Sequence, residues 1–187
     1  MPRHRKPVSP EPSKFVATHA EEIAKKANGL IVDIACGYGR NAVCIADFGT
    51  KVFCLDNNPE ALEHIASLET KGQLQTQHVD LLKDPWPFED NSLGAIINVH
   101  FLTSKLLDCF ICSLKIGGLL LIETIDGHGN NYRQLPPQGF IKAALGDMFD
   151  IKHITERKVG PIESDASTLK LFAIKINAAI APMRPFL

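Results

Sequence analysis

The sequence predicts an α/β fold in which a doubly wound, mostly parallel sheet carries helices on both faces and an antiparallel hairpin at its C-terminal end. Short apolar runs rich in β-branched residues alternate with segments of helical length, the pattern of a sheet built from βαβ units. The last two strand-like segments follow each other directly, which favours an antiparallel pair. The length fits one domain, so we expect a flexible lead at 1–12, a single domain at 13–177 and a tail at 178–187.

Capping and turn residues mark the expected helices. Ser13 can cap the first helix, and Asn28 with Gly29 ends it. Pro59 suits the first turn of the third helix, where its missing N–H has no partner to lose. The helices are expected at about 13–27, 41–48, 59–68, 103–115 and 139–148.

The expected strands are short and mostly apolar. Residues 30–35 and 119–124 are nearly continuous apolar runs, as in strands buried on both faces. Two prolines make residues 84–90 a loop, and residues 126–138 form a long polar loop of the kind that often carries function. The strands are expected at 30–35, 51–55, 73–79, 93–99, 119–124, 151–159 and 168–176.

Charge and hydropathy argue against nucleic-acid and membrane partners. The formal net charge is -1, so no global field attracts nucleic acid or a membrane surface. A basic cluster at residues 3–6 is interpreted as a solvated chain end rather than a nucleic-acid arm. Prolines follow this cluster where a signal peptide needs an apolar stretch, and no apolar run has the length of a membrane span. We expect no nucleic-acid or membrane partner.

The cysteines point to a reducing compartment. Five cysteines in a chain of this size favour free thiols and a cytoplasmic location. Cys109 and Cys112 have C-x-x-C spacing, but they fall in an expected helix and no second pair completes a zinc site. No metal is therefore expected.

The turn after the first strand carries the strongest chemical signal. It begins with Asp33 and contains Gly37 and Gly39, which allow a ligand to approach the backbone and the chain to turn into the next helix. With Ala42 the turn matches a loose G-x-G-x-x-A, which by itself is weak. A carboxylate at Asp33 would repel the pyrophosphate of a dinucleotide. It would instead favour S-adenosylmethionine, which carries sulfonium and ammonium cations and no phosphate.

Two further acids follow the next two strands. Asp56 could accept hydrogen bonds from both hydroxyls of a ribose, a role that NAD would also use. Asp80 could accept one from an adenine amino group, or be an ordinary surface acid in a loop. Asp33 has a structural alternative too, as the N-cap of a helix. Three acids that close three successive strands favour a nucleoside-containing cofactor.

These residues resemble the class I S-adenosylmethionine-dependent methyltransferases. The resemblance rests on residues 33–41, on Asp56 and Asp80, and on residues 98–101, and it spans about 30–124. Residues 39–42 and 117–124 are closest to the tellurite-resistance and thiopurine-methyltransferase-like branch. The resemblance implies a Rossmann-like sheet and a methyltransferase that acts on a small-molecule acceptor. One departure is Leu93-Gly94, where many relatives have an aromatic residue and an acid.

The resemblance also implies which residues hold S-adenosylmethionine. Asp33 and the Gly37 backbone would bind the methionine end, and Asn98 would accept from its ammonium group. Asp56 would bind the ribose, while further residues would lie along the adenine. The implied cofactor residues are Asp33, Ala35, Cys36, Gly37, Gly39, Arg40, Asn41, Asp56, Asn57, Asn58, Asp80, Leu81, Asn98 and Val99.

Four side chains are candidates for a general base or an acceptor contact: His100, Glu123, His128 and Tyr132. His100 has the alternative of a packing histidine, and Glu123 that of a structural hydrogen bond. His128 and Tyr132 belong to residues 126–137, which we expect to cover the acceptor, although a plain solvent loop is the alternative. A thiolate acceptor would need no base, whereas a hydroxyl or amine would.

Two other functions stay open at this point. A non-catalytic S-adenosylmethionine-binding or interaction protein would have the same glycine turn. An NAD-linked oxidoreductase would fit Asp56 but not Asp33. The expected oligomeric state is a monomer or a weak homodimer, and the variable loops of such enzymes leave the acceptor unidentified.

Overall fold

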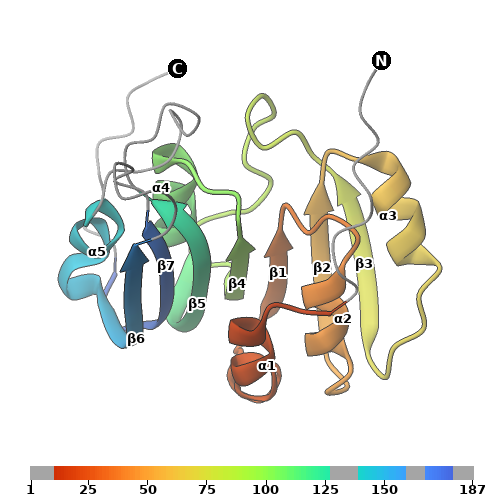
Figure 1. Ribbon diagram of the computed structural model, residues 1–187, viewed down its shortest axis with the longest axis horizontal. Helices are drawn as coiled ribbons and strands as arrows, with labels where there is room; N and C mark the ends of the chain where they lie inside the picture. The colour runs from red at the N-terminus through yellow and green to blue at the C-terminus, as the bar shows by residue number, and fades with distance from the viewer. Residues whose placement is uncertain (1–10, 127–138, 159–166, 179–187) are drawn as a thin grey trace.

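The computed structural model describes residues 11–126, 139–158 and 167–178, and seven strands of this part form one sheet (Figure 1). The strands are β1 Leu30–Ile34, β2 Lys51–Asp56, β3 Gln73–His78, β4 Leu93–Val99, β5 Leu114–Asp126, β6 Phe149–Lys158 and β7 Ser167–Lys175. Their order across the sheet is β3-β2-β1-β4-β5-β7-β6. The first five run parallel, and β7 is antiparallel to both β5 and β6. The predicted α/β class and the C-terminal hairpin are confirmed.

The first helix begins at its predicted cap, Ser13, and the third begins at Pro59, as predicted. The Ser13 hydroxyl accepts from the Phe15 N–H at the start of α1, and Asn58 caps α3 just before Pro59. None of the helices in the described part of the chain is long and apolar enough to span a bilayer. The helices are α1 Lys14–Lys26, α2 Arg40–Ala46, α3 Pro59–Ala66, α4 Ser104–Ser113 and α5 Phe140–Leu145, followed by a 3₁₀ turn at Gly146–Met148.

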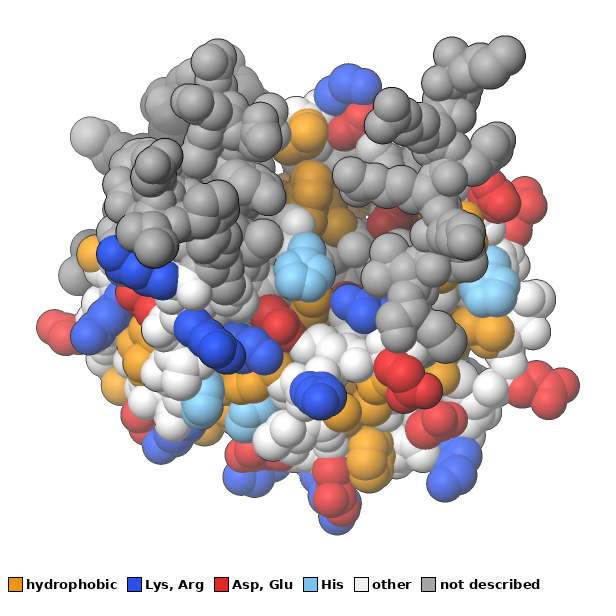
Figure 2. Space-filling model, viewed as in Figure 1, with side chains coloured by type: hydrophobic (Ala, Val, Ile, Leu, Met, Phe, Trp, Pro, Cys, Tyr) orange, Lys and Arg blue, Asp and Glu red, His pale blue; other side chains and the backbone are white. Residues whose placement is uncertain are grey.

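The helices cover the sheet on both faces, as the apolar strands require. One face packs against α1, α2 and α3, with Ile23, Ile45 and Ile65 fully or almost fully buried. The other face packs against α4 and α5, where Phe110 and Leu145 are fully buried. Acidic, basic and hydrophobic side chains are interspersed over the face shown in Figure 2, and one hydrophobic group lies at its upper centre.

The crossover from β3 to β4 contains no helix in the structure, in agreement with the predicted loop. Aromatic residues cover this part of the sheet instead. The Trp86 ring lies 5.4 Å from Phe88 and 5.7 Å from Phe110, and its indole N–H donates to Ser113 Oγ at 2.7 Å. Trp86 and Phe88 therefore serve packing in this part of the structure.

One predicted boundary is wrong. The helix expected to reach 115 ends at Ser113, and β5 begins at Leu114 rather than at 119. Leu114 already pairs with Leu93 on β4, so a tertiary contact overrides the helical pattern of the sequence. At Gly94, part of the noted departure, an added Cβ would lie 2.4 Å from the Gly29 nitrogen. Close backbone packing therefore explains this glycine.

Candidate active site at the carboxyl edge of the sheet

The predicted cofactor residues gather where the strand order reverses. β1 lies between β2 and β4, so the chain leaves its carboxyl end toward one side and returns on the other. In doubly wound sheets, ligands bind in the crevice at such a switch point. The structure thus brings together the turn after β1, the end of β2 and the end of β4.

The glycine turn is held tightly to β2. The Cys36 N–H donates to the Leu55 carbonyl at 3.0 Å, and the Gly39 N–H donates to the Cys36 carbonyl at 3.0 Å. A Cβ at Gly39 would lie 2.7 Å from Ile65 Cγ1, so this glycine serves packing on α3. A Cβ at Gly37 would meet no atom within 4 Å, although its φ of +55° strains any other residue. The space beside Gly37 is therefore open to a ligand.

Two non-glycine residues at this edge adopt left-handed backbone. Ala35 follows β1 with φ 53°, and His100 follows β4 with φ 66°. His100 is held there by its N–H, which donates to the Glu123 carbonyl at 2.7 Å. Such conformations cost about 1–3 kcal/mol and cluster at functional sites. This strain could not be predicted from the sequence, because neither residue is a glycine.

Asp33, at the end of β1, lies inside the protein. Its side chain is 1% exposed, and its Oδ2 atom has no hydrogen-bond partner within the described residues. Burial, assisted by the nearby Asp56 carboxylate, raises the pKa of Asp33 to about 7 against the opposing effects of the Ala42 N–H and Arg40. A buried, unpartnered carboxylate of this kind would bind a cation strongly.

Asp56 shapes the turn as well as facing the expected ribose. Its Oδ2 accepts from the Gly37 N–H at 2.7 Å, and its Oδ1 accepts from the Asn58 N–H at 2.9 Å. The Asn57 carbonyl lies 3.2 Å from His78 Nε2. The carboxylate thus fixes the glycine turn relative to β2, a second role that the sequence did not indicate.

Asn98 is the second buried residue whose side-chain oxygen has no hydrogen-bond partner among the described residues. The side chain is fully buried on β4, its amide donates to the Phe101 carbonyl, and its Oδ1 has no partner among the described residues. Asn98 pairs with Ile34 in the sheet register, one position beyond Asp33. The adjacent ends of β1 and β4 therefore hold one unpartnered oxygen each, and Val99 is buried beside them.

Asp80 lies apart from this pair, at the end of β3. Its carboxylate forms an ion pair with Lys83 at 3.0 Å and accepts from the Leu82 N–H at 3.1 Å. The hydrogen bond from Lys83 lowers the pKa of Asp80. Asp80 and the partly buried Leu81 follow β3 as expected, and the carboxylate already has protein partners.

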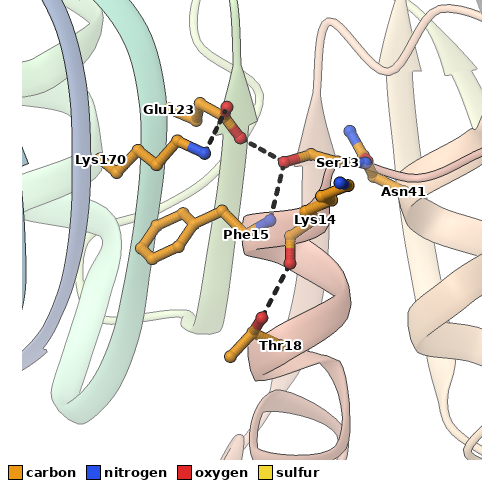
Figure 3. Close-up of polar contacts among 7 residues, drawn as sticks. All are labelled: Ser13, Lys14, Phe15, Thr18, Asn41, Glu123 and Lys170. Carbon is orange, nitrogen blue, oxygen red and sulfur yellow. Dashed lines mark hydrogen bonds and ion pairs between the residues drawn. The ribbon is translucent and has the colours of Figure 1, made fainter. Parts of the chain in front are cut away.

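Glu123 takes the structural alternative that the sequence left open. The side chain is buried near the end of β5, receives a hydrogen bond from the Ser13 hydroxyl and pairs with Lys170 at 3.2 Å (Figure 3). Asn41, another predicted cofactor residue, accepts from the Ser13 N–H at 2.9 Å. The other two candidates, His128 and Tyr132, and residues 127–137 of the expected cover lie outside the described residues.

Residues 31–118 match the methyltransferase domain family. The match runs from β1 into β5, just under half of the chain, and includes the glycine turn, Asp56 and Asn98. A search of curated proteins found no match.

Solved structures with the same fold include several methyltransferases. The geranyl diphosphate C-methyltransferase of Streptomyces coelicolor A3(2), in complex with Mg²⁺, geranyl diphosphate and S-adenosyl-L-homocysteine, has a TM-score of 0.63 at 15% identity; the match covers 86% of this chain and 77% of that one. A Methanosarcina mazei SAM-dependent methyltransferase has a TM-score of 0.60 at 17% identity, covering 83% and 96%. The [4+2]-cyclase SpnF has a TM-score of 0.61 at 14% identity, covering 86% and 81%.

At these identities the structural similarity establishes the fold. Together with the family match, it supports the class I methyltransferase superfamily and an enzyme of the S-adenosylmethionine-dependent methyltransferase type. The cyclase shows that this fold also serves other chemistry. The reaction of this chain must therefore be argued from its own site.

Proposed function

We propose that the protein transfers a methyl group from S-adenosylmethionine to a small-molecule acceptor. The observation that carries the proposal is the pair of buried, unpartnered oxygens, Asp33 Oδ2 and Asn98 Oδ1, at the switch point of the sheet. Buried polar groups are almost always hydrogen-bonded, so two exceptions at one edge indicate a ligand with cationic or donor groups. The methionine end of S-adenosylmethionine supplies an ammonium group of that kind.

The other residues would hold the nucleoside. Asp56 would accept from the ribose hydroxyls with the lone pairs that Gly37 and Asn58 leave free. The open space beside Gly37 would receive the ligand, and Asp80 with Leu81 would lie at the adenine edge. The run from Gly39 to Ala42 supports placing the enzyme near the tellurite-resistance and thiopurine-methyltransferase-like branch.

The reaction would be an in-line displacement in which the acceptor attacks the methyl carbon and neutral S-adenosylhomocysteine leaves. Because the sulfonium is already activated, positioning can supply about 7–11 kcal/mol of the acceleration. His100 is exposed at the end of β4, where its left-handed backbone directs the chain away from the strand. It is the described candidate for a base, and His128 and Tyr132 are proposed acceptor contacts.

Isothermal titration with S-adenosylmethionine, S-adenosylhomocysteine and NAD tests the proposal. We expect both methionine-derived ligands to bind and NAD not to bind. Gly37→Val should weaken binding at least about tenfold, because a branched side chain fills the ligand's space. Gly49→Val is the matched control: Gly49 also has positive φ, +85°, and open space at its Cβ, but follows α2 on the opposite edge. Equal effects of both variants would place the site elsewhere.

Turnover needs a separate assay, since binding alone would also fit a non-catalytic protein. Methyl-labelled S-adenosylmethionine can be offered with thiols, metalloid oxyanions, phenols and amines. Label transfer to one class, abolished in Gly37→Val, would support the enzyme and identify its acceptor. Tight binding with no transfer to any class would favour the non-catalytic function.

A further inference from the structure

Ser13 connects the two sides of the switch-point crevice. Its N–H donates to Asn41 Oδ1 at 2.9 Å, and its hydroxyl donates to Glu123 Oε2 while accepting from the Phe15 N–H at 3.1 Å (Figure 3). Asn41 belongs to the first turn of α2, directly after the glycine turn, and Glu123 belongs to β5. A single residue ahead of α1 thus joins elements that are 28 and 110 positions away in sequence.

The two partners of Ser13 are buried. Asn41 is 4% exposed and Glu123 is 8% exposed, so these hydrogen bonds act in a medium where they are stronger than in water. Lys170 balances the Glu123 carboxylate at 3.2 Å and also lies 5.7 Å from the centre of the Phe15 ring. The Glu123 carbonyl holds the His100 N–H as well. The network therefore fixes the end of β4 through the same residue.

A second contact ties the same segment to α2. Arg40 Nη1 donates to the Glu11 carbonyl at 3.2 Å, one helical position before Asn41. The stretch from Glu11 to Ser13 therefore lies across the start of α2 and reaches β5. Any shift of this stretch would move the start of α2, and with it the glycine turn, relative to β4 and β5.

We propose that Ser13 is a positioning residue that sets the glycine turn against the ends of β4 and β5, and that Glu123 is its anchor and not the general base. This inference rests on the proposed binding of S-adenosylmethionine at that turn. Ser13 touches neither the cofactor nor the acceptor in this role. It acts through Asn41 on one side of the crevice and through Glu123 on the other.

Affinity for S-adenosylhomocysteine, titrated far below the unfolding temperature, measures this role. At that temperature a loss of stability alone leaves the dissociation constant unchanged, because the protein stays folded. Ser13→Ala should weaken binding several-fold, because the start of α2 and the glycine turn would no longer be tied to Glu123 on β5. Ser13→Thr keeps the hydroxyl and should recover most of the affinity.

The matched control is Thr18→Ala. Thr18 lies on the same helix, and its hydroxyl donates to the Lys14 carbonyl at 2.8 Å without reaching α2 or β5 (Figure 3). Its affinity should stay within about twofold of the wild type. Wild-type affinity in Ser13→Ala would overturn the inference and leave the proposed function intact. A wild-type protein that binds no S-adenosylhomocysteine would instead overturn the proposed function.

A double-mutant cycle tests whether Ser13 affects binding through its hydrogen bond to Glu123. If Ser13 acts through Glu123, the variants Ser13→Ala and Glu123→Ala should each weaken binding, and the double variant should be no weaker than the worse single one. Additive losses would mean that the two residues act independently, and the inference would be wrong.

Discussion

Two buried ionisable residues lie at opposite edges of the sheet and differ in how fully the protein satisfies their hydrogen bonds. Lys175 and Asp33 are each 1% exposed. At the amino edge of the parallel strands, Lys175 Nζ donates to the Ile111 and Leu114 carbonyls at 2.7 and 2.6 Å and to Asn91 Oδ1 at 3.4 Å. At the carboxyl edge, Asp33 keeps one oxygen without a partner in the described part of the chain.

This difference indicates that Lys175 serves the stability of the fold, whereas Asp33 serves the binding of a ligand. The three acceptors of Lys175 match the three donors of an ammonium group, so the protein itself completes that site. An unpartnered buried carboxylate destabilises the folded protein, and it persists where binding offsets the cost. The comparison predicts that changing Lys175 harms folding and spares binding, whereas changing Asp33 does the reverse.

The largest expected effect is that Asp33→Asn removes a pH dependence of the free energy of unfolding. The pKa of Asp33 rises from 3.8 to about 7 on folding, so the folded protein binds the proton more tightly than the unfolded chain does. This carboxyl therefore lowers the free energy of unfolding as the pH rises from about 4 to 7. The loss amounts to roughly 4 kcal/mol at 1.36 kcal/mol per unit. Asp33→Asn should lack it.

Urea unfolding of both proteins across this pH range measures the difference. The two stability curves should approach each other near pH 4 and diverge toward pH 7, and the variant should bind S-adenosylmethionine more weakly throughout. Curves that stay parallel would show that Asp33 is ionised in the same range in both states.

Lys175→Met should have the next largest effect, on stability alone. It leaves the Ile111 and Leu114 carbonyls buried without donors, at a cost of about 2–3 kcal/mol in the free energy of unfolding. Lys51→Met is a suitable control, because Lys51 is exposed on β2. Affinity for S-adenosylhomocysteine should not change, and a marked loss of affinity would break the distinction between the two edges.

Asp56→Ala should affect both cofactor binding and the stability of the glycine turn. Losing the ribose contacts should weaken cofactor binding by about 1.5–3 kcal/mol, and losing the bond from the Gly37 N–H should disturb the turn. Asp56→Glu should recover little, because the added methylene moves the carboxylate. A 2′-deoxy analogue that binds the wild type as tightly as its parent would remove the ribose assignment.

Ala35→Gly should have the smallest effect. Glycine relieves the left-handed strain at φ 53° but increases the entropy of the unfolded chain, so the net change should stay within about 1 kcal/mol. Ala61→Gly, at a buried position in the first turn of α3, should destabilise more clearly and gives the contrast. Thermal unfolding compares the two, and an equal loss in both would show that Ala35 is not strained.

The sequence predicted the parallel half of the sheet well because its signals are local. The apolar runs, the cap at Ser13, the proline at Pro59 and the turn from Asp33 each reflect near neighbours in the chain. The early end of α4 was missed because it depends on distant partners: Leu93 pairs with Leu114, and Lys175 accounts for the carbonyls at the junction.

The same reasoning explains what was missed at the site. The residues of the turn could be predicted, because their types and spacing carry the chemistry. The burial of Asp33, the strain at Ala35 and the engagement of Glu123 by Ser13 could not. Each of these depends on residues brought together only by the fold, across as many as 110 positions.

The strand order β5-β7-β6 also has a consequence for synthesis on the ribosome. β7 is made after all the other strands, yet it lies between two of them and pairs with both. Until Ser167–Lys175 emerges, β5 has an open edge and β6 has no place in the sheet. Open apolar edges are sites of aggregation in partly made chains. The antiparallel half can therefore be assembled only after Ser167–Lys175 has been made, and the nascent chain is most prone to aggregate just before that point.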